Sequence, residues 1–334
     1  MIDRRHFNCA LAAAPILALP DLARAEPSTI RLGTMRLSSA ATFFVATDKG
    51  FFEDESLQVQ IEFFDAAAQL PVAAVATSID VGMTAFTAAF FNLAGKGGLK
   101  LVCGDGRPHP AFPNNQLVAS RSGHGSGLRA FADIRGRRLG ITTVGSSFHY
   151  QLGAIATKFG FPLSQVELVP LQTLQNLGSS VAAGRLDGAV LPSTVADPLV
   201  RSGVGVFVGN LADVDTTQGS GVFTRPDFIS ANRPAMERFL RAHRRAMTFC
   251  HEAVNRLDEK GQPIEGEERD ELLDIVARRT GQTRQQVSAS FSFYDPDARL
   301  NVGDVRKVLR FWQDQGLVKR ELAAEDVIDA SFAS

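Results

Sequence analysis

The stretch Gly140-Ile-Thr-Thr-Val-Gly-Ser-Ser-Phe-His-Tyr-Gln-Leu-Gly-Ala-Ile-Ala-Thr-Lys-Phe-Gly160 decides the fold of this chain. Residues Leu139 to Thr143 predict a short buried strand, because they are apolar and β-branched with glycine near each end. Ser146 and Ser147 follow a glycine turn and predict the start of a helix, since serine is a favoured N-cap residue. Apolar residues then recur at helical spacing until Gly160, a residue type that ends helices. A strand therefore feeds a helix through a turn of small residues.

The start of this helix has the chemistry of an anion site. Free backbone N–H groups, the hydroxyls of Ser146 and Ser147, and the positive end of the helix dipole meet at one point. A capped turn between a strand and a helix also occurs in α/β proteins for purely structural reasons. Both interpretations stay open on this stretch alone.

Composition limits the class of protein. The chain has 334 residues, of which 45% are hydrophobic and 21% charged, as expected for a folded protein of one or two domains. The formal net charge is −1, and no basic, aromatic-rich surface is indicated, so we expect no nucleic-acid partner. The glycines of Gly123-x-Gly125-x-Gly127 do not complete a dinucleotide motif and predict a solvated loop.

Cysteine use gives no sign of a metal site. Beyond the N-terminal segment only Cys103 and Cys250 remain, and neither their number nor their spacing fits zinc. They are either two separate buried thiols or one disulfide, and the sequence does not decide between these. We expect no cofactor and no metal.

Residues 1–25 have the features of a cleaved export signal. Arg4-Arg5 precede an apolar run that is too short to span a bilayer, and Ala23-Arg24-Ala25 forms a cleavage site. The arginine pair resembles a twin-arginine signal. We therefore predict a periplasmic protein without a membrane anchor.

Strands alternate with helices along the rest of the chain, which predicts an α/β fold with parallel pairing. Polar loops at the carboxyl ends of strands are where such sheets bind ligands. In the first half these loops carry a small set of polar residues, namely Arg36, Ser38, Ser39, Gln69 and Thr84.

A sequence pattern that occurs twice predicts two lobes of similar structure. The segments Ala73 to Gly82 and Ser180 to Ala189 share a helix end, a turn, an Asp and a small apolar strand. Extended crossings near 118–120 and 221–223 would form the hinge. We assign the first lobe to 26–118 and to 222–334, which is helical from Pro234 onward, and the second lobe to 119–221.

The order of motifs resembles a known family. It comprises Gly-Phe-Phe-Glu at 50–53, Ile79-Asp-Val-Gly82, Gly145-Ser-Ser-x-His149 and Gly184-Arg-Leu-Asp-Gly-Ala189. This order is similar to that of periplasmic solute-binding proteins of ABC importers for sulfonates, taurine and nitrate, a group that also resembles thiamine-precursor binders. The resemblance implies a type II periplasmic binding protein fold, in which each lobe is a mixed sheet flanked by helices and two crossing strands form the hinge.

The resemblance also implies the binding residues and the partners. By position these residues are Ser38, Ser39, Gln69, Thr84, Ser146, Ser147, His149 and Ser193. It implies a monomer that captures a small organic anion, a sulfonate or a carboxylate with or without an aromatic body, and docks transiently on a membrane permease. Where many members have Trp-Asp-Pro, this chain has Leu191-Pro-Ser-Thr194. Because of that departure the site lacks an aromatic wall. The sequence therefore does not decide whether the solute is nitrate, an alkylsulfonate, an aromatic carboxylate or a neutral pyrimidine.

Two other functions fit the same fold. Thiamine-pyrimidine synthases resemble it but carry clustered cysteines that this chain lacks, and Ser147 and His149 are poorly spaced for nucleophile and base. We therefore expect a binding protein and not an enzyme. A ligand-sensing module that docks on another membrane protein would share both pocket and export signal. Whether His149 donates to the ligand or only caps the helix stays open, as do ligand contacts by Arg36, Phe43, Phe44, Phe86 and Phe148.

Overall fold

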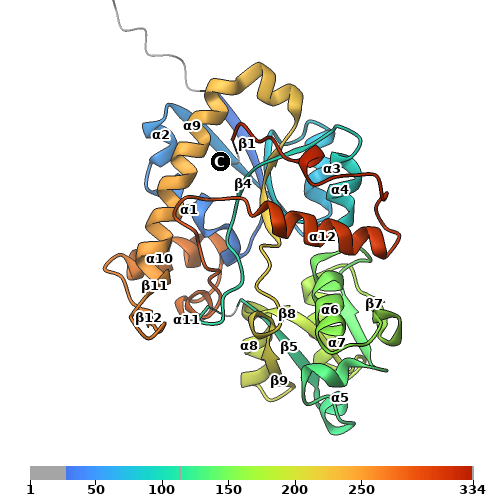
Figure 1. The fold of residues 1–334 in the computed structure, drawn as a ribbon. Coiled ribbons are helices and arrows are strands. Elements are labelled where there is room, and N and C mark those ends of the chain that lie inside the picture. Colours follow the sequence, from blue (N-terminus) through green and yellow to red (C-terminus); the bar gives the residue numbers. More distant parts are fainter. Residues whose placement is uncertain (1–27, 113, 333–334) are drawn as a thin grey trace, which may run out of the picture.

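The computed structural model describes residues 28–112 and 114–332, which form two α/β lobes (Figure 1). The predicted export signal, residues 1–25, lies outside this range. Within the described residues no helix is both long and apolar enough to span a membrane.

The first lobe is built on a mixed sheet with strand order β2-β1-β3-β10-β4. Its strands are β1 (Ser28–Met35), β2 (Leu57–Phe64), β3 (Val81–Ala85), β4 (Lys100–Gly104) and β10 (Ser220–Thr224). Strand β1 pairs parallel with β2 and β3, whereas β10 runs antiparallel to β3 and β4. The predicted parallel core is therefore present, and the antiparallel strand that makes the sheet mixed comes from the distant return of the chain.

The second lobe repeats this arrangement with strand order β7-β6-β8-β5-β9. Its strands are β5 (Asn115–Ser120), β6 (Arg138–Ile141), β7 (Glu167–Pro170), β8 (Gly188–Pro192) and β9 (Gly205–Asn210). Strand β6 pairs parallel with β7 and β8, and β5 runs antiparallel to β8 and β9. Strand β5 thus has the place in this sheet that β10 has in the first.

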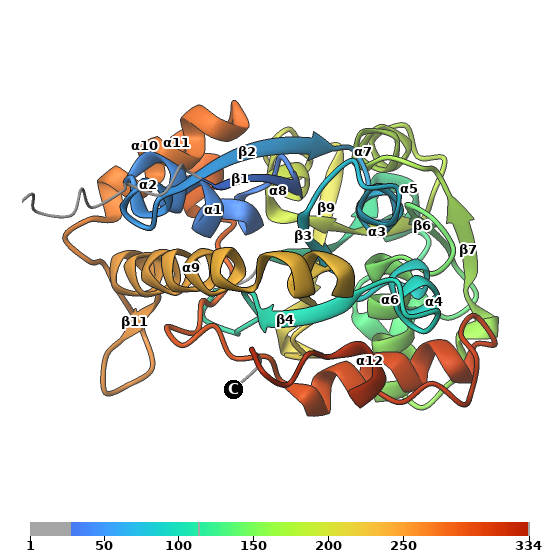
Figure 2. The same cartoon turned by 90° about the horizontal axis from the view of Figure 1, so that it is seen from above.

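Helices cover both faces of each sheet (Figure 2). Those of the first lobe are α1 (Ala41–Asp48), α2 (Phe51–Asp54), α3 (Gln69–Val75), α4 (Ala88–Ala94), α9 (Pro226–Cys250), α10 (Arg269–Thr280), α11 (Arg284–Ser288) and α12 (Val302–Asp314). Those of the second lobe are α5 (Arg121–Gly125), α6 (Ser147–Lys158), α7 (Leu174–Ala182) and α8 (Ser193–Arg201).

The repeated sequence pattern corresponds to the same arrangement of hydrogen bonds in both lobes. The Arg31 N–H donates to Asp80 Oδ2 at 3.0 Å, and the Arg138 N–H donates to Asp187 Oδ2 at 2.8 Å. In return the N–H of each aspartate donates to the carbonyl of the same arginine, at 2.8 and 2.9 Å. Asp80 therefore ties the start of β3 to β1, and Asp187 ties the start of β8 to β6, which is a structural role and not a ligand contact.

The chain crosses between the lobes twice, through residues 105–114 and 211–219. The boundaries expected from sequence, at 118/119 and 221/222, fall inside β5 and β10. A strand that pairs along its length with two neighbours cannot be divided between lobes. We therefore propose lobe boundaries within the two connecting segments.

The local predictions also differ from the structure at three places. The glycines from Gly123 onward lie in the short helix α5 and the turn after it, because Ser120 caps that helix by accepting from the Gly123 N–H at 3.0 Å. Helix α9 begins at Pro226, a favoured first-turn residue, and crosses Pro234 with a kink at Asn232. The segment from Pro234 onward, which was expected to be helical, also contains a two-stranded hairpin, β11 (Arg256–Leu257) with β12 (Pro263–Ile264).

Candidate ligand-binding site

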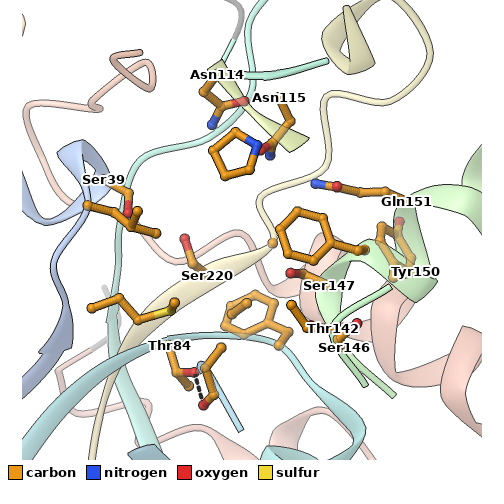
Figure 3. Close-up of a pocket in the computed structure, with 18 of the residues that line it drawn as sticks. Ser39, Thr84, Asn114, Asn115, Thr142, Ser146, Ser147, Tyr150, Gln151 and Ser220 are labelled. Atoms are coloured by element: carbon orange, nitrogen blue, oxygen red, sulfur yellow. Dashed lines mark hydrogen bonds between the residues drawn. The ribbon is translucent and has the colours of Figure 1, made fainter. Parts of the chain in front are cut away.

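A cavity of about 200 Å³ lies between the two lobes. Its walls come from the segments that follow β1, β2 and β3 in the first lobe and β6 and β8 in the second (Figure 3). Both crossing segments contribute further residues. This is the edge at which open α/β sheets bind ligands, because the carboxyl ends of their parallel strands meet there.

The start of α6 faces this cavity as the sequence predicts. Ser146 is the N-cap, and its Oγ accepts from the His149 N–H at 3.4 Å. Gly145 turns the chain with φ of +83°, a conformation that favours glycine. The N–H groups of Ser147 and Phe148 have no acceptor within the part of the chain that the structure describes. Two free donors at a helix N-terminus therefore point to a place for an acceptor or anion.

Three predicted residues of the first lobe also line the cavity, namely Ser38, Ser39 and Thr84. Ser38 is buried and engaged, because its Oγ donates to Gln282 at 3.2 Å and accepts from Ser290 at 2.7 Å. The Thr84 hydroxyl donates to the Ala67 carbonyl at 2.9 Å (Figure 3). Ser39 keeps a partly exposed hydroxyl at the cavity wall. Of these three hydroxyl groups, that of Ser39 is the most available for contact with a ligand.

Gln69 and Ser193 do not line the cavity, although their chain neighbours do. Gln69 is exposed on the first turn of α3, while Leu70 faces inward. Ser193 is fully buried and accepts from Gln116 Nε2 at 3.3 Å. Successive helical residues point about 100° apart, so a residue next to a lining position need not face the cavity itself.

His149 lies behind the helix start and does not line the cavity either. Its Nδ1 accepts from the Gly145 N–H at 3.0 Å, and its ring meets Trp312 edge to face at 5.3 Å. Of the two roles left open by the sequence, this geometry supports a structural one at the start of the helix. Burial lowers the pKa of His149 to about 4.

The lowered pKa of His149 makes folding stability depend on pH. An unfolded histidine binds a proton near pH 6.5, whereas folded His149 does so only near pH 4. Its contribution is therefore complete above pH 6.5 and is lost as pH falls toward 4. We expect His149→Gln to reduce the loss of melting temperature between pH 7 and pH 5, measured by thermal denaturation.

Partly exposed His124 is the matched control, and His124→Gln should leave the pH profile as it is. Some acid sensitivity should persist in His149→Gln, because burial also lowers the pKa of His243 to about 4. A profile identical to wild type in His149→Gln would contradict this assignment.

Several polar lining residues were missed by the sequence analysis. They are Asn114, Asn115, Thr142, Thr143, Tyr150, Gln151, Thr194, Asp215, Thr217 and Ser220. Gln151 lies one turn beyond Ser147 on the same helix, a spacing that the sequence does contain. The asparagines, Asp215 and Thr217 belong to or adjoin the crossing segments, and no local pattern marked these as walls.

The cavity lining carries no Lys, Arg or His among the described residues; its charged members are Asp65 and Asp215. Lys307 Nζ lies 2.8 Å from Asp215 Oδ1 and balances that carboxylate. Arg36 is not a lining residue, since its guanidinium stacks on Phe63 at 3.8 Å and donates to the Arg279 carbonyl at 3.0 Å. An anion would therefore be held by neutral donors and the helix dipole alone.

Apolar side chains form much of the remaining wall. Phe86 and Phe148 line the cavity together with Met35, Leu37, Leu70, Met83, Leu174 and Leu211. Phe43 and Phe44 are fully buried in the core of the first lobe instead. Cys103 and Cys250 are buried and unpaired, and neither lines the cavity.

Comparison with solved structures defines the class of fold. The alkanesulfonate-binding protein SsuA from Xanthomonas axonopodis pv. citri, bound to MOPS, matches with TM-score 0.72 and 19% identity over 91% of this chain and 99% of that one. The periplasmic nitrate-binding protein NrtA from Synechocystis PCC 6803 matches with TM-score 0.69 and 14% identity over 90% and 84%. A mutant of the enzyme DszB in complex with biphenyl-2-sulfinic acid matches with TM-score 0.59 and 15% identity over 92% and 98%. The chain thus has the two-lobed periplasmic binding protein fold.

The family follows from a sequence comparison. A family model described as "NMT1/THI5 like" matches residues 38–254, well over half of the chain. The protein belongs to the NMT1/THI5-like family. None of the curated proteins compared with the chain matches it significantly.

Proposed function

We propose that this protein is the periplasmic substrate-binding component of an ABC importer. It captures a small organic anion, a sulfonate or a carboxylate with or without an aromatic body, between its lobes. The observation that carries the proposal is the interlobe cavity into which α6 presents the unpaired N–H groups of Ser147 and Phe148. The sulfonate- and nitrate-binding proteins that share the fold support a binding role.

The anionic group would rest against the start of α6. It would accept from the N–H groups of Ser147 and Phe148 and from the Ser147 hydroxyl, and charge-assisted bonds of this kind contribute about 1.5–3 kcal/mol each. The apolar wall near Phe86 and Phe148 would hold the solute's body. Because the described lining residues include no Lys, Arg or His to supplement these donors, the site favours a singly charged head group over a dianion.

Delivery to a membrane permease, export by the twin-arginine route and a monomeric state belong to the same proposal. A solute-binding component meets its permease transiently from the outer side of the membrane. The apolar run with Arg4-Arg5 in the N-terminal segment supports the export step.

An enzyme is the second candidate, because DszB shares the fold. Covalent catalysis in such a cavity needs a nucleophile with an adjacent base. Within the described lining residues there is no Cys, His or Lys, and His149 is turned away from Ser147. Turnover of a bound compound by the purified protein would nevertheless replace the binding proposal.

Replacing both Ser146 and Ser147 with alanine tests the proposal. We expect the affinity for a bound sulfonate or carboxylate to fall by well over tenfold, because each change removes a donor or loosens the helix start that supplies donors. The measurement is isothermal titration of the protein with a compound found by thermal-shift screening.

Ser164→Ala, at an exposed position of the second lobe outside the cavity, is the matched control. The double variant should keep a cooperative thermal transition. Unchanged affinity in the folded double variant would remove the start of α6 from the binding site.

A further inference from the structure

The cavity contains three buried polar atoms without a hydrogen-bond partner among the described residues. They are the Tyr150 hydroxyl, Gln151 Oε1 and Thr194 Oγ1, and all belong to the second lobe. Tyr150 is 7% exposed, and Gln151 is directed from α6 into the cavity (Figure 3). Leaving such a group unpaired costs about 1–3 kcal/mol, so these atoms favour an occupant that forms hydrogen bonds with them.

Gln151 and Tyr150 together favour a particular occupant. A carboxamide oxygen only accepts, so Gln151 Oε1 requires a donor from the ligand. Burial and the Asp215 carboxylate raise the pKa of Tyr150, so its hydroxyl stays protonated and keeps lone pairs that can accept. Neither Asp215 nor Thr217, which both act on that pKa, makes a hydrogen bond of normal geometry with the hydroxyl.

The charge balance around these groups favours an uncharged donor over an ammonium group. Asp215 is already paired with Lys307 at 2.8 Å and accepts from Thr217 Oγ1 at 2.5 Å. Asp65, the other lining carboxylate, lies on the first lobe and is exposed, so solvent screens it. No uncompensated buried negative charge is left to stabilise a cation beside Gln151.

We propose that Gln151 and Tyr150 are specificity-determining residues, which select a solute that carries an uncharged hydrogen-bond donor, such as a hydroxyl or a carboxamide, on its apolar body. This inference rests on the proposed binding function. A solute group that reaches these atoms gains the hydrogen bonds that they lack in the structure. A methyl group in that place would leave the acceptors unpaired.

Matched compounds test this selection. The probes are 3-hydroxybenzenesulfonate and 3-methylbenzenesulfonate, with 3-hydroxybenzamide and 3-methylbenzamide as an uncharged pair. Isothermal titration of the wild-type protein should give at least about tenfold tighter binding of a hydroxyl compound than of its methyl counterpart, the ratio expected for one well-made hydrogen bond. Gln151→Leu and Tyr150→Phe should each lower that ratio to about threefold or less, while the methyl compounds keep their affinity.

Gln69→Leu is the matched control, because Gln69 is exposed outside the cavity and its loss should leave the ratio unchanged. Tyr150→Phe retains the aromatic contact with Phe311, so folding is preserved. Equal affinities within each pair, or ratios unaffected by both variants, would overturn the inference and leave the proposed function standing. If 3-hydroxybenzamide bound more tightly than 3-methylbenzamide while neither sulfonate bound, the inference would be supported. The same result would count against the proposal that the solute is an anion. No binding of any probe would overturn both.

Discussion

Replacing Trp312 with alanine is expected to lower the free energy of unfolding by about 3–5 kcal/mol, the usual cost of truncating a buried tryptophan. Trp312 is fully buried, and its indole N–H donates to the Phe86 carbonyl at 2.8 Å. It belongs to α12 of the first lobe yet contacts His149 of α6 in the second. The variant would lose core packing, a buried hydrogen bond and a contact between the lobes.

Because α12 and α6 approach each other closely, the neighbouring side chains have little freedom to repack around the cavity left by Trp312→Ala. A Cβ atom at Gly153 would lie 2.2 Å from the Phe311 ring, so the two helices already meet at a glycine. Chemical denaturation followed by circular dichroism measures the effect, since Trp312 is the only tryptophan in the chain. Arg310→Ala, exposed on the same helix, should change stability by less than about 0.5 kcal/mol. A loss below about 1 kcal/mol in Trp312→Ala would contradict the packing described.

Replacing Asp80 with alanine is the second large effect, with an expected loss of about 3 kcal/mol. Asp80 accepts from Arg31 Nη2 at 2.7 Å, and Arg225 Nη2 lies 3.9 Å from it. Removing the carboxylate leaves Arg225, whose side chain is 11% exposed, with the exposed Asp227 at 3.2 Å in place of a buried counter-ion. The backbone N–H of Arg31 would also lose its acceptor.

Asp187→Ala is the matched comparison, because Asp187 performs the same backbone role in the second lobe and forms no ion pair with the residues that the structure describes. Its loss should cost about 1 kcal/mol, the value of one hydrogen bond. Burial alone would raise the pKa of Asp80, but hydrogen bonds from Arg31 outweigh it and the pKa is lowered. The extra stability is therefore present above the unfolded pKa and disappears as pH falls through the lower folded value. Equal losses in the two variants, measured by urea denaturation at pH 7, would show that the ion pairs add nothing.

The two-lobed fold was predictable because its signals are local and occur twice. The Ile-Asp-Val-Gly and Leu-Asp-Gly-Ala segments marked equivalent strands, and the structure pairs both aspartates in the same way. Extended segments near 118–120 and 221–223 were expected, but no local pattern indicated which strands they pair with or in which direction. Strand β10 joins the first sheet only after the chain has formed the second lobe, and β5 pairs with β8 and β9, which lie about 70 or more residues later in the chain, so only the tertiary structure fixes such pairings.

The candidate site was predictable where a strand end and a helix cap coincide. Ser146 and Ser147 lie at the cavity because the cap fixes their direction. Gln69 was misplaced by one position on a helix, and His149 is turned away by Trp312, a residue 163 positions later in the chain. Tyr150 depends for its burial on Phe311 and Trp312 of α12, which no local pattern reveals.

A crystal structure of the protein with the tightest-binding sulfonate or carboxylate tests the central claim most directly. The account predicts one molecule between the lobes, with its anionic group within hydrogen-bond distance of the Ser147 and Phe148 N–H groups. A molecule bound outside the interlobe cavity, or one whose anionic group points away from α6, would contradict it.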